Sequence, residues 1–524
     1  MPLGDEKHKL IFQGLVNILG PQYVDDDPAV MEAFSRDGMT PNLMLKSRFE
    51  FIALPGSTED VQQIYRLANR LEFPVSISVT GLTMGLCSAV DNYPYWCMID
   101  PKRMNRILHI DADDMYAVIE PAVTIAQLQA EAMKEGLFCG VTGASTTSSA
   151  VSTNMFQSIH WTGWRTGVGV NVLGFEWVLP NGDLMRTGML GMPGGGWSWG
   201  EGPGPDPRGL LRGHISHVGS LGATTRMAVK LYPWPGPRVW PTEGVQPEKK
   251  SVLPPNKIKS YFINFPSLEN SVYAIREMGK AEIAGYVMKY APWDFVCWYA
   301  KSFEEFWAEW NSPYWTKQKE SGYLVAVGLW AFAFEKQIKY EEKVLFQIME
   351  EFGGELVPPD IHAKMDAVVT PCTVRDTYRH RFTRLGRVSV VGATMDSLYD
   401  VLRSVPIDRA LRAKYTPPLG PMGNDIKFWP FHFGRICWTE VDSIAEKSDE
   451  QEELTMKQLV PEEIKVAMEN RAANTGMANA QHVVGPYFDN VHLFLAGIKK
   501  TLDPHNVANP TRVIDMKAME KIAK

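Results

Sequence analysis

The sequence predicts an α+β protein built from two domains. The chain has 524 residues, enough for two or three domains with a large buried core. Segments with the apolar period of strands alternate with segments of helical period through residues 51–232, and again through residues 260–352. Between these regions, residues 234–256 are rich in proline and charge. Such a composition is typical of a boundary between domains.

The first helix signal follows an apolar stretch at 51–55. Ser57 is placed as the N-cap and Asp60 as the third helical residue, a pair similar to a capping box. Apolar residues then recur at helical spacing, at Val61, Ile64, Leu67, Ala68 and Leu71. We expect the helix to end at Phe73-Pro74 and a strand to occupy 75–79.

The rest of the first domain is predicted to be mainly strands. Strands are expected to end at Asp100 and to span 116–120, 171–179, 184–187 and 223–232, with a helix at 125–135. The Pro-Asn-Gly-Asp turn at 180–183 makes its two flanking strands a hairpin. Residues 191–213 are long, irregular and rich in Gly, Pro and Trp, as functional or disordered loops are.

The second domain shows the pattern of a cap with an antiparallel sheet. Strands at 260–265 and 324–334 alternate with helices at 268–278 and 340–352, and the run ends near Glu440. Residues 443–453 are acidic and are interpreted as a solvated connector. Two further helices are predicted at 461–474 and 491–502, the second stopped by Asp503-Pro504.

Composition excludes several classes of protein. The net charge of -7, without a Lys/Arg run, argues against a nucleic-acid binder. No apolar run is long enough to span a bilayer, and residues 1–26 lack a signal-peptide core, so a cytoplasmic enzyme is expected. The six cysteines form no CxxC pair, which disfavours a disulfide framework or a cysteine-held metal. Cys87 is the candidate for a reactive thiol, although a small buried apolar residue is the favoured interpretation.

The strongest local signal is the segment 79–86, Val-Thr-Gly-Leu-Thr-Met-Gly-Leu. A strand runs into a short loop in which Gly81 and Gly85 permit positive φ angles. Such a loop can present consecutive backbone N–H groups to a pyrophosphate. A simple structural turn is the alternative, because the segment is neither a GxGxxG motif followed by a helix nor a Walker loop with its lysine.

Five further motif segments lie before and after this loop, at 55–61, 119–124, 178–183, 219–225 and 502–510. Together with the 79–86 loop they resemble the FAD domain of the vanillyl-alcohol oxidase and p-cresol methylhydroxylase (PCMH) superfamily, which includes glycolate-oxidase-like flavoproteins. The resemblance implies an α+β fold with a PCMH-type FAD-binding domain at 1–240 (core about 47–235). It further implies an antiparallel-sheet substrate or cap domain at 241–470, and a segment at 471–524 that completes the FAD domain.

The same resemblance implies the residues that contact FAD. The pyrophosphate loop is expected to provide Thr80, Gly81, Leu82, Thr83, Met84, Gly85, Leu86 and Ser88. The remaining contacts are expected from Pro121, Gly143, Ser145, Thr146, Ser149, Gly222, Ala223 and Thr224.

Two segments resemble the phenol-oxidising branch of the superfamily, at 186–194 and 199–203. That branch anchors a phenolate with two tyrosines and an arginine and places an aspartate near the flavin. Here Leu86 and Gln481 stand at the tyrosine positions, Gln157 at the aspartate, and only Arg512 is retained. Gln157 and Arg512 are therefore the expected substrate-binding residues, and a simple 4-alkylphenol is disfavoured as substrate.

The 2-hydroxy-acid branch holds a metal with two histidines and a glutamate. His432 and His482 match its histidine motifs, but Thr439 and Gln481 replace two of the three ligands. We therefore expect no catalytic metal. His432 and His482 remain candidates for a catalytic base, the alternative being hydrogen-bonded core histidines.

One arginine could clamp an anionic substrate group. Arg381 is the choice from an arginine-rich stretch, and a solvated helix face is the alternative. The stretch consists of Arg375, Arg379, Arg381, Arg384 and Arg387.

These features lead to three functional hypotheses. The first is an FAD-dependent dehydrogenase that oxidises a small hydroxylated or aromatic substrate by hydride transfer. Its electrons would pass to a protein partner (a cytochrome, an iron–sulfur subunit or an electron-transfer flavoprotein), and it would form a homo-oligomer or hetero-complex. The second is an oxidase that uses oxygen. The third is a non-catalytic flavin-fold binding or assembly subunit, which the departures at Leu86, Gln157, Thr439 and Gln481 keep open.

Overall fold

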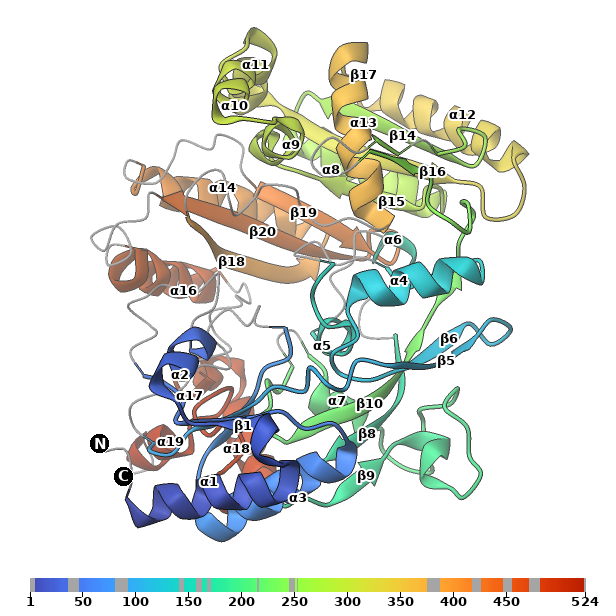
Figure 1. The fold of residues 1–524 in the computed structure, drawn as a ribbon. Coiled ribbons are helices and arrows are strands. Elements are labelled where there is room, and N and C mark those ends of the chain that lie inside the picture. Colours follow the sequence, from blue (N-terminus) through green and yellow to red (C-terminus); the bar gives the residue numbers. More distant parts are fainter. Residues whose placement is uncertain are drawn as a thin grey trace.

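The computed structural model describes residues 5–35, 47–80, 93–140, 146–156, 163–166, 171–213, 216–244, 250–251, 253–374, 387–416, 426–445, 455–470 and 481–522. Figure 1 shows that both ends of the chain lie in the lower half of the molecule, while the middle of the chain forms the upper half. The lower half contains a four-stranded and a five-stranded sheet and the upper half a seven-stranded sheet, and two short two-stranded pairings complete the described strands. The fold is therefore α+β with a cap, as predicted.

The first sheet has the order β1-β2-β4-β3, and β2, β4 and β3 run parallel. Its strands are β1 (Val24–Asp25), β2 (Phe51–Ala53), β3 (Val75–Ile77) and β4 (Cys97–Ile99). The helices beside it in the chain are α1 (Glu6–Leu19), α2 (Pro28–Phe34) and α3 (Thr58–Leu71). Ser57 caps α3 by accepting a hydrogen bond from the Asp60 amide, and Asp60 accepts one from the Gly56 amide. This confirms the predicted helix start.

The second sheet is antiparallel with the order β5-β6-β10-β8-β9. Its strands are β5 (Ile107–Asp111), β6 (Tyr116–Ile119), β8 (Val172–Val178), β9 (Leu184–Arg186) and β10 (Ala223–Lys230). Pairing of β8 with β9 confirms the predicted hairpin. Helices α4 (Ile125–Lys134), α5 (Ala150–Met155), α6 (Gly163–Thr166) and α7 (Arg208–Leu211) accompany this part of the chain, with a short pairing of β7 (Leu137–Phe138) and β11 (Tyr232–Pro233).

The cap contains a seven-stranded antiparallel sheet in the order β17-β14-β16-β15-β19-β20-β18. Its strands are β14 (Ile258–Phe265), β15 (Tyr286–Lys289), β16 (Tyr323–Trp330), β17 (Glu355–Leu356), β18 (Arg387–Ser397), β19 (Ile426–Phe431) and β20 (Ile436–Ala445). A small hairpin of β12 (Thr242–Glu243) and β13 (Lys250–Ser251) precedes it.

Helices cover both faces of the cap sheet. Apolar side chains of α8 (Leu268–Lys280), α12 (Lys336–Glu351) and α14 (Asp400–Ala413) form one cluster with the sheet. Those of α9 (Pro292–Tyr299) and α13 (Pro359–Val374) belong to a second cluster on the other face. The remaining cap helices are α10 (Phe303–Trp310), α11 (Pro313–Ser321) and α16 (Val460–Glu469).

Two sequence predictions for the cap were wrong about a terminal residue of the predicted segment. Ser443 was assigned to a solvated connector, yet β20 continues through it and pairs it with Ser389 of β18. Arg387 was grouped with a helix face, yet it opens β18 opposite Ala445. In both cases, sheet pairing between segments about 50 residues apart overrides the local polar pattern.

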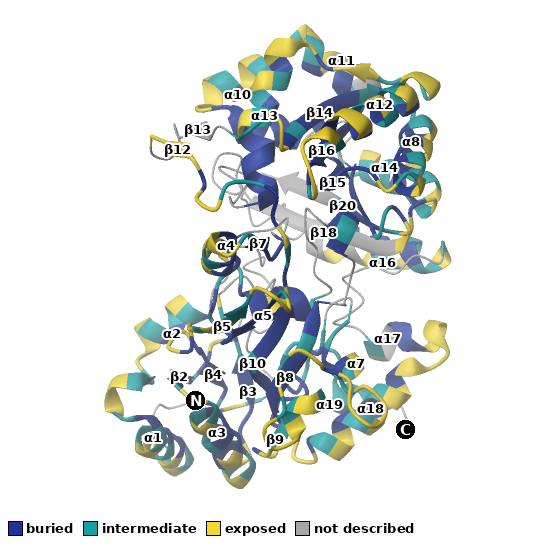
Figure 2. Ribbon diagram, turned by 90° about the vertical axis from the view of Figure 1, so that its right-hand side faces the viewer, coloured by how far each residue is buried: buried dark blue, intermediate teal, exposed yellow. Residues whose placement is uncertain are grey.

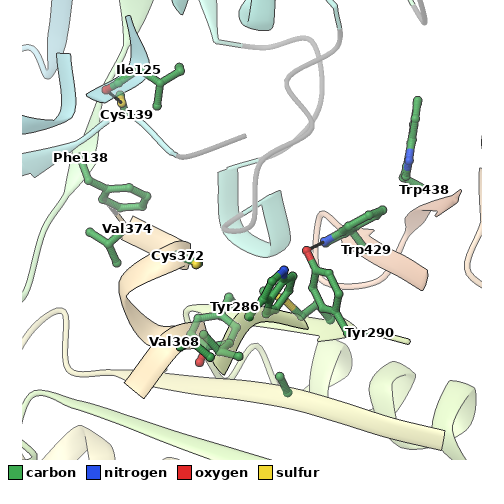
Figure 3. Packing of buried hydrophobic residues seen from close by; sticks show 14 of the residues in the cluster. Ile125, Phe138, Cys139, Tyr286, Tyr290, Val368, Cys372, Val374, Trp429 and Trp438 are labelled. Atoms are coloured by element: carbon green, nitrogen blue, oxygen red, sulfur yellow. Dashed lines mark hydrogen bonds between the residues drawn. The ribbon is translucent and has the colours of Figure 1, made fainter. Parts of the chain in front are cut away.

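The largest apolar cluster crosses from the lower half of the molecule into the cap. In Figure 3, Ile125, Phe138 and Cys139 come from the lower half, whereas Tyr290, Trp429 and Trp438 come from the cap. Figure 2 shows this buried material in dark blue on both sides of the junction. The two halves therefore share one core.

The C-terminal segment returns to the first sheet. After α17 (Gln481–Val484) and α18 (Val491–Leu502), the Val507 carbonyl accepts a hydrogen bond of 2.7 Å from the Val75 amide. The Asn509 amide donates to the Val75 carbonyl at 2.8 Å, and α19 (Met516–Ile522) follows. This confirms the predicted return of the chain. None of the described helices has the length and apolar character needed to cross a membrane.

Candidate cofactor and substrate site

Ser149 fixes the start of α5 against the end of β6. Its hydroxyl donates to the Pro121 carbonyl at 2.6 Å and accepts from the Ser152 amide at 3.1 Å, which makes it the N-cap of α5. The Thr146 carbonyl accepts from the Ala126 amide at 2.8 Å. Three residues predicted to line the flavin, Pro121, Thr146 and Ser149, therefore lie together and are buried.

Gly222 opens β10 with φ = +106°, a conformation that favours glycine. A Cβ atom at this position would lie 2.2 Å from the Val178 carbonyl oxygen. Next to it, Ala223 pairs with Val178. The buried hydroxyl of Thr224 has no hydrogen-bond partner within the described part of the chain. An unsatisfied buried hydroxyl costs about 1–3 kcal/mol, so it is suited to receive a ligand.

These two regions lie at the same end of the sheets. β10 pairs with β6 from Met227 opposite Ile119, which precedes Pro121 by two residues. A Cβ on Gly219 would lie 3.0 Å from Cγ2 of Ile77, the last residue of β3. Thr80 follows three residues later and is exposed. The turn that leads into β10 thus lies beside the end of β3, the strand that runs towards Thr80.

Several predicted site residues lie outside the described residues. They are Gly81, Leu82, Thr83, Met84, Gly85, Leu86, Ser88, Gly143, Ser145, Gln157 and Arg381, together with the candidate thiol Cys87.

The cap presents an aromatic wall with buried charges toward the shared core. Nε1 of Trp429 donates to the Tyr290 hydroxyl at 3.2 Å, as Figure 3 shows. Nε1 of Trp438 donates to Glu440 at 3.3 Å. Nζ of Lys427 lies 3.2 Å from Oε1 of the same glutamate, and the lysine side chain is wholly buried.

α5 joins the flavin-lining residues to this wall. Ser149 begins the helix, and Phe156 follows its last residue. The ring of Phe156 packs edge-on against Trp438, with 6.2 Å between the ring centroids. α5 thus connects the predicted flavin-contacting residue Ser149 with Trp438 of the cap, whose indole donates to Glu440.

His432 lies in the tight turn between β19 and β20. Its backbone has φ = +49°, and its amide donates to the Gly163 carbonyl of α6 at 3.2 Å. Burial, and then the charge of Arg435, lower the pKa of this half-buried imidazole. A lowered pKa keeps the ring neutral near pH 7 and therefore able to accept a proton.

The other two predicted residues lie in the C-terminal segment. His482 belongs to the short helix α17. Arg512 is half-buried three residues after Asn509, and its amide donates to the Asn509 carbonyl at 3.2 Å. Arg512 therefore follows directly on the segment that bonds β3.

The FAD binding domain model (FAD_binding_4) matches residues 49–188. A 1'-carboxy-chondrochloren decarboxylase from Chondromyces crocatus is 32% identical over 42% of this chain and 39% of its own length. The flavoprotein subunit of 4-cresol dehydrogenase (hydroxylating) from Pseudomonas putida is 30% identical over 34% of each chain. The matches therefore span well under half of these relatives.

Among solved structures, p-cresol methylhydroxylase with substrate bound superposes with a TM-score of 0.76. The superposition covers 98% of both chains at 17% sequence identity, so it shows that the two proteins share a fold. Residues 49–188 therefore match an FAD binding domain, and the whole chain has the fold of p-cresol methylhydroxylase. The cofactor of this chain is FAD.

The described residues are compatible with FAD. Gly222 lets the backbone pack closely against the Val178 carbonyl at the start of β10, and Thr224 has a buried hydroxyl without a hydrogen-bond partner in the described part of the chain. Thr146 and Ser149 are small and buried, which suits packing against a flat ring. No group of three His, Cys, Asp or Glu side chains that could hold a metal occurs among the described residues.

Sequence reasoning missed the charged part of the cap wall. Lys427 stands inside the otherwise apolar strand Ile-Lys-Phe-Trp-Pro-Phe, and Glu440 lies beside it in the sheet register. Asp294 of α9 lies 3.6 Å from the same ammonium group. A lysine in an apolar strand was the available signal, because lysine is almost never fully buried unless it is paired.

Proposed function

We propose that this protein is an FAD-dependent dehydrogenase of the cytoplasm. It oxidises a small hydroxylated or aromatic organic substrate by hydride transfer to the flavin and passes the electrons to a protein partner. In this proposal, residues 1–240 and 471–524 hold FAD, and residues 241–470 close over the substrate.

The observation that carries the proposal is the contact between α5 and the cap wall. The helix starts at Ser149 and ends against Trp438, whose indole donates to Glu440. Flat aromatic surfaces such as Trp429 and Trp438 suit an aromatic or small organic substrate. The bound FAD supplies the hydride acceptor, and the protein supplies orientation and proton transfer.

Glu440 is a candidate acceptor for a substrate hydroxyl proton. Its carboxylate accepts hydrogen bonds from Trp438 and Lys427, which orient it. His482 and His432 are the alternative bases, and Arg381 is proposed to clamp an anionic group. Gln157 and Arg512 are proposed as substrate contacts.

The relatives support the redox part of the proposal. One of them is named as a dehydrogenase and as a flavoprotein subunit, which fits transfer of electrons within a complex. For the present chain, the partner is proposed to be a cytochrome, an iron–sulfur subunit or an electron-transfer flavoprotein.

An anaerobic substrate screen tests the proposal. Purified protein is mixed with phenols, benzylic alcohols and 2-hydroxy acids while the flavin absorbance near ~450 nm is followed. We expect at least one compound to bleach the flavin. Retention of full absorbance with every class would count against the dehydrogenase and would favour a binding subunit.

Variants then assign the proton acceptor. Glu440→Gln should slow flavin reduction by about 10²-fold, whereas Glu355→Gln, an exposed glutamate of the same domain, should not. His482→Ala is compared in parallel. If only the histidine variant slows reduction, the role passes from Glu440 to His482.

The electron acceptor is tested with the reduced protein. Exposure to air should reoxidise the flavin far more slowly than turnover with an artificial electron acceptor such as a redox dye. Reoxidation by oxygen at the turnover rate would make the protein an oxidase instead.

A further inference from the structure

The turn at residues 216–222, which leads into β10, has an unusual backbone. Ser216, Val218, Gly219 and Gly222 all have positive φ angles, of 61°, 48°, 75° and 106°. For a β-branched residue such as Val218 this conformation is strained, and strained backbone persists only where its surroundings enforce it. The partners of this turn are therefore of interest.

Buried side chains hold three of its carbonyl groups. Nδ2 of Asn509 donates to the Val218 carbonyl at 2.6 Å. Nζ of Lys499 donates to the Ser220 carbonyl at 2.6 Å, and Nε1 of Trp177 donates to the Leu221 carbonyl at 2.7 Å. Because its carbonyls are fixed, the direction of the chain that follows is fixed as well.

His217, a residue of the same turn, forms a hydrogen bond inside it. Its Nδ1 accepts a hydrogen bond of 3.3 Å from the Leu221 amide. Burial, and then the charge of Lys499, lower the pKa of this imidazole to about 3. The ring is therefore neutral near pH 7, as an accepting Nδ1 requires.

Lys499 is the centre of this arrangement, with a side chain that is only 1% exposed. Its ammonium donates to Asp503 at 2.6 Å, to the Ser220 carbonyl and to the Ala508 carbonyl. Asp503 in turn accepts from the amides of Val507 and Ala508, each at 2.9 Å. All three N–H donors of the ammonium are thus used.

The same residues reach the other cofactor element. Val507 and Asn509 bond both backbone groups of Val75 in β3, which runs towards Thr80. The Lys499–Asp503 pair therefore connects the 216–222 turn with the strand that leads to the predicted pyrophosphate loop.

We propose that Lys499 and Asn509 are positioning residues for FAD. By holding the Ser220 and Val218 carbonyls, they set the direction of the backbone at Gly222–Thr224, where the cofactor is expected to bind. This inference rests on the proposed role of FAD, and it assigns to the C-terminal segment a task in cofactor binding.

The test compares flavin binding with stability. Lys499→Met and Asn509→Ala are measured for free-flavin fluorescence on dilution, which gives the dissociation constant of FAD, and for the visible circular dichroism of the flavin. The dichroism reports the flavin environment even if FAD is covalently attached. We expect FAD affinity to fall about tenfold in Lys499→Met, less in Asn509→Ala, and the dichroism to change in both.

Leu15→Ala is the matched control, because Leu15 is fully buried in α1 and bonds no part of the turn. It should lower the melting temperature without changing FAD affinity or the dichroism. If the two test variants behave like Leu15→Ala, their residues are merely structural and the inference is wrong. Should Lys499→Met fail to fold, Asn509→Ala decides the question. If the wild-type protein itself holds no flavin, it is the proposed function that fails.

Discussion

Lys499 and Lys427 are two of the buried lysines among the described residues; they lie in different halves of the molecule and have different partners. In the C-terminal segment, Lys499 bonds one carboxylate and two backbone carbonyls. In the cap, Lys427 lies between the carboxylates of Glu440 and Asp294, beside the Trp429 ring. Backbone partners fix the path of the chain, whereas carboxylate partners can still exchange protons. Lys499 therefore holds backbone in the lower half, as Lys289 holds the Ile426 carbonyl in the cap, whereas Lys427 differs from both because it pairs with two carboxylates.

The largest effect is expected from a substitution that breaks the Lys499–Asp503 ion pair. Asp503→Ala would leave Lys499 buried without its carboxylate and would free two backbone amides. Removing one member of a buried ion pair costs about 3–5 kcal/mol of unfolding free energy. Urea denaturation measures this cost.

Lys500→Met is the control for Asp503→Ala, because Lys500 is the exposed neighbour of the buried lysine. It should change stability by less than about 0.5 kcal/mol. Equal effects of the two variants would contradict a structural role for the buried pair.

A second prediction concerns Gly222, the last residue of the turn at 216–222. Gly222→Ala would place a Cβ 2.2 Å from the Val178 carbonyl at φ = +106°. We expect a loss of about 2–3 kcal/mol and a reduced flavin content. Gly497→Ala is the matched control, since nothing lies within 4 Å of its added Cβ. A flavin content in Gly222→Ala equal to that of the control would argue against the site.

In the cap, a third prediction uses pH. Burial raises the pKa of Glu463 in α16 to about 8, although Arg412 of α14 lies 2.7 Å away. The folded-state pKa is above that of the unfolded chain. The stability from the protonated group is therefore fully present below about pH 4.5 and is lost as the pH rises through about 8.

Glu463→Gln should flatten this dependence. Relative to the variant, the wild-type protein should lose on the order of 2 kcal/mol of unfolding free energy between pH 5 and 8. Urea denaturation across this pH range measures it. Parallel curves for the two proteins would show that Glu463 ionises normally.

The smallest expected losses of stability come from removing a helix N-cap, and they should be equal in the two halves. Ser57 and Ser267 each cap a helix, by accepting from the amides of Asp60 and Asn270. Replacing either serine with alanine should cost about 1 kcal/mol in thermal or urea unfolding. A much larger cost in one half would mean that the halves differ in more than their buried charges.

Much of the fold could be predicted because local signals were strong. The segment 491–502 was predicted as a helix and is one, since Asp503-Pro504 stops it. The capping pair at Ser57 likewise fixed the start of α3. In contrast, helices α9–α11 were not predicted, because their crowded aromatic residues give no clear period.

The site was harder to predict than the fold. Of the predicted FAD-contacting residues, Pro121 and Ser149 are joined by a hydrogen bond, and the role of both in cofactor binding stays a prediction. The Lys427–Asp294 contact joins residues more than a hundred positions apart, so no local pattern reports it. The strained backbone of Val218 is set by the distant Asn509 and is equally invisible in the sequence.

The most direct test of the whole account is the visible absorption spectrum of the purified wild-type protein. We expect flavin bands near ~450 nm that correspond to about one FAD per chain. A protein that folds cooperatively but shows no flavin bands, even after incubation with excess FAD, would contradict it.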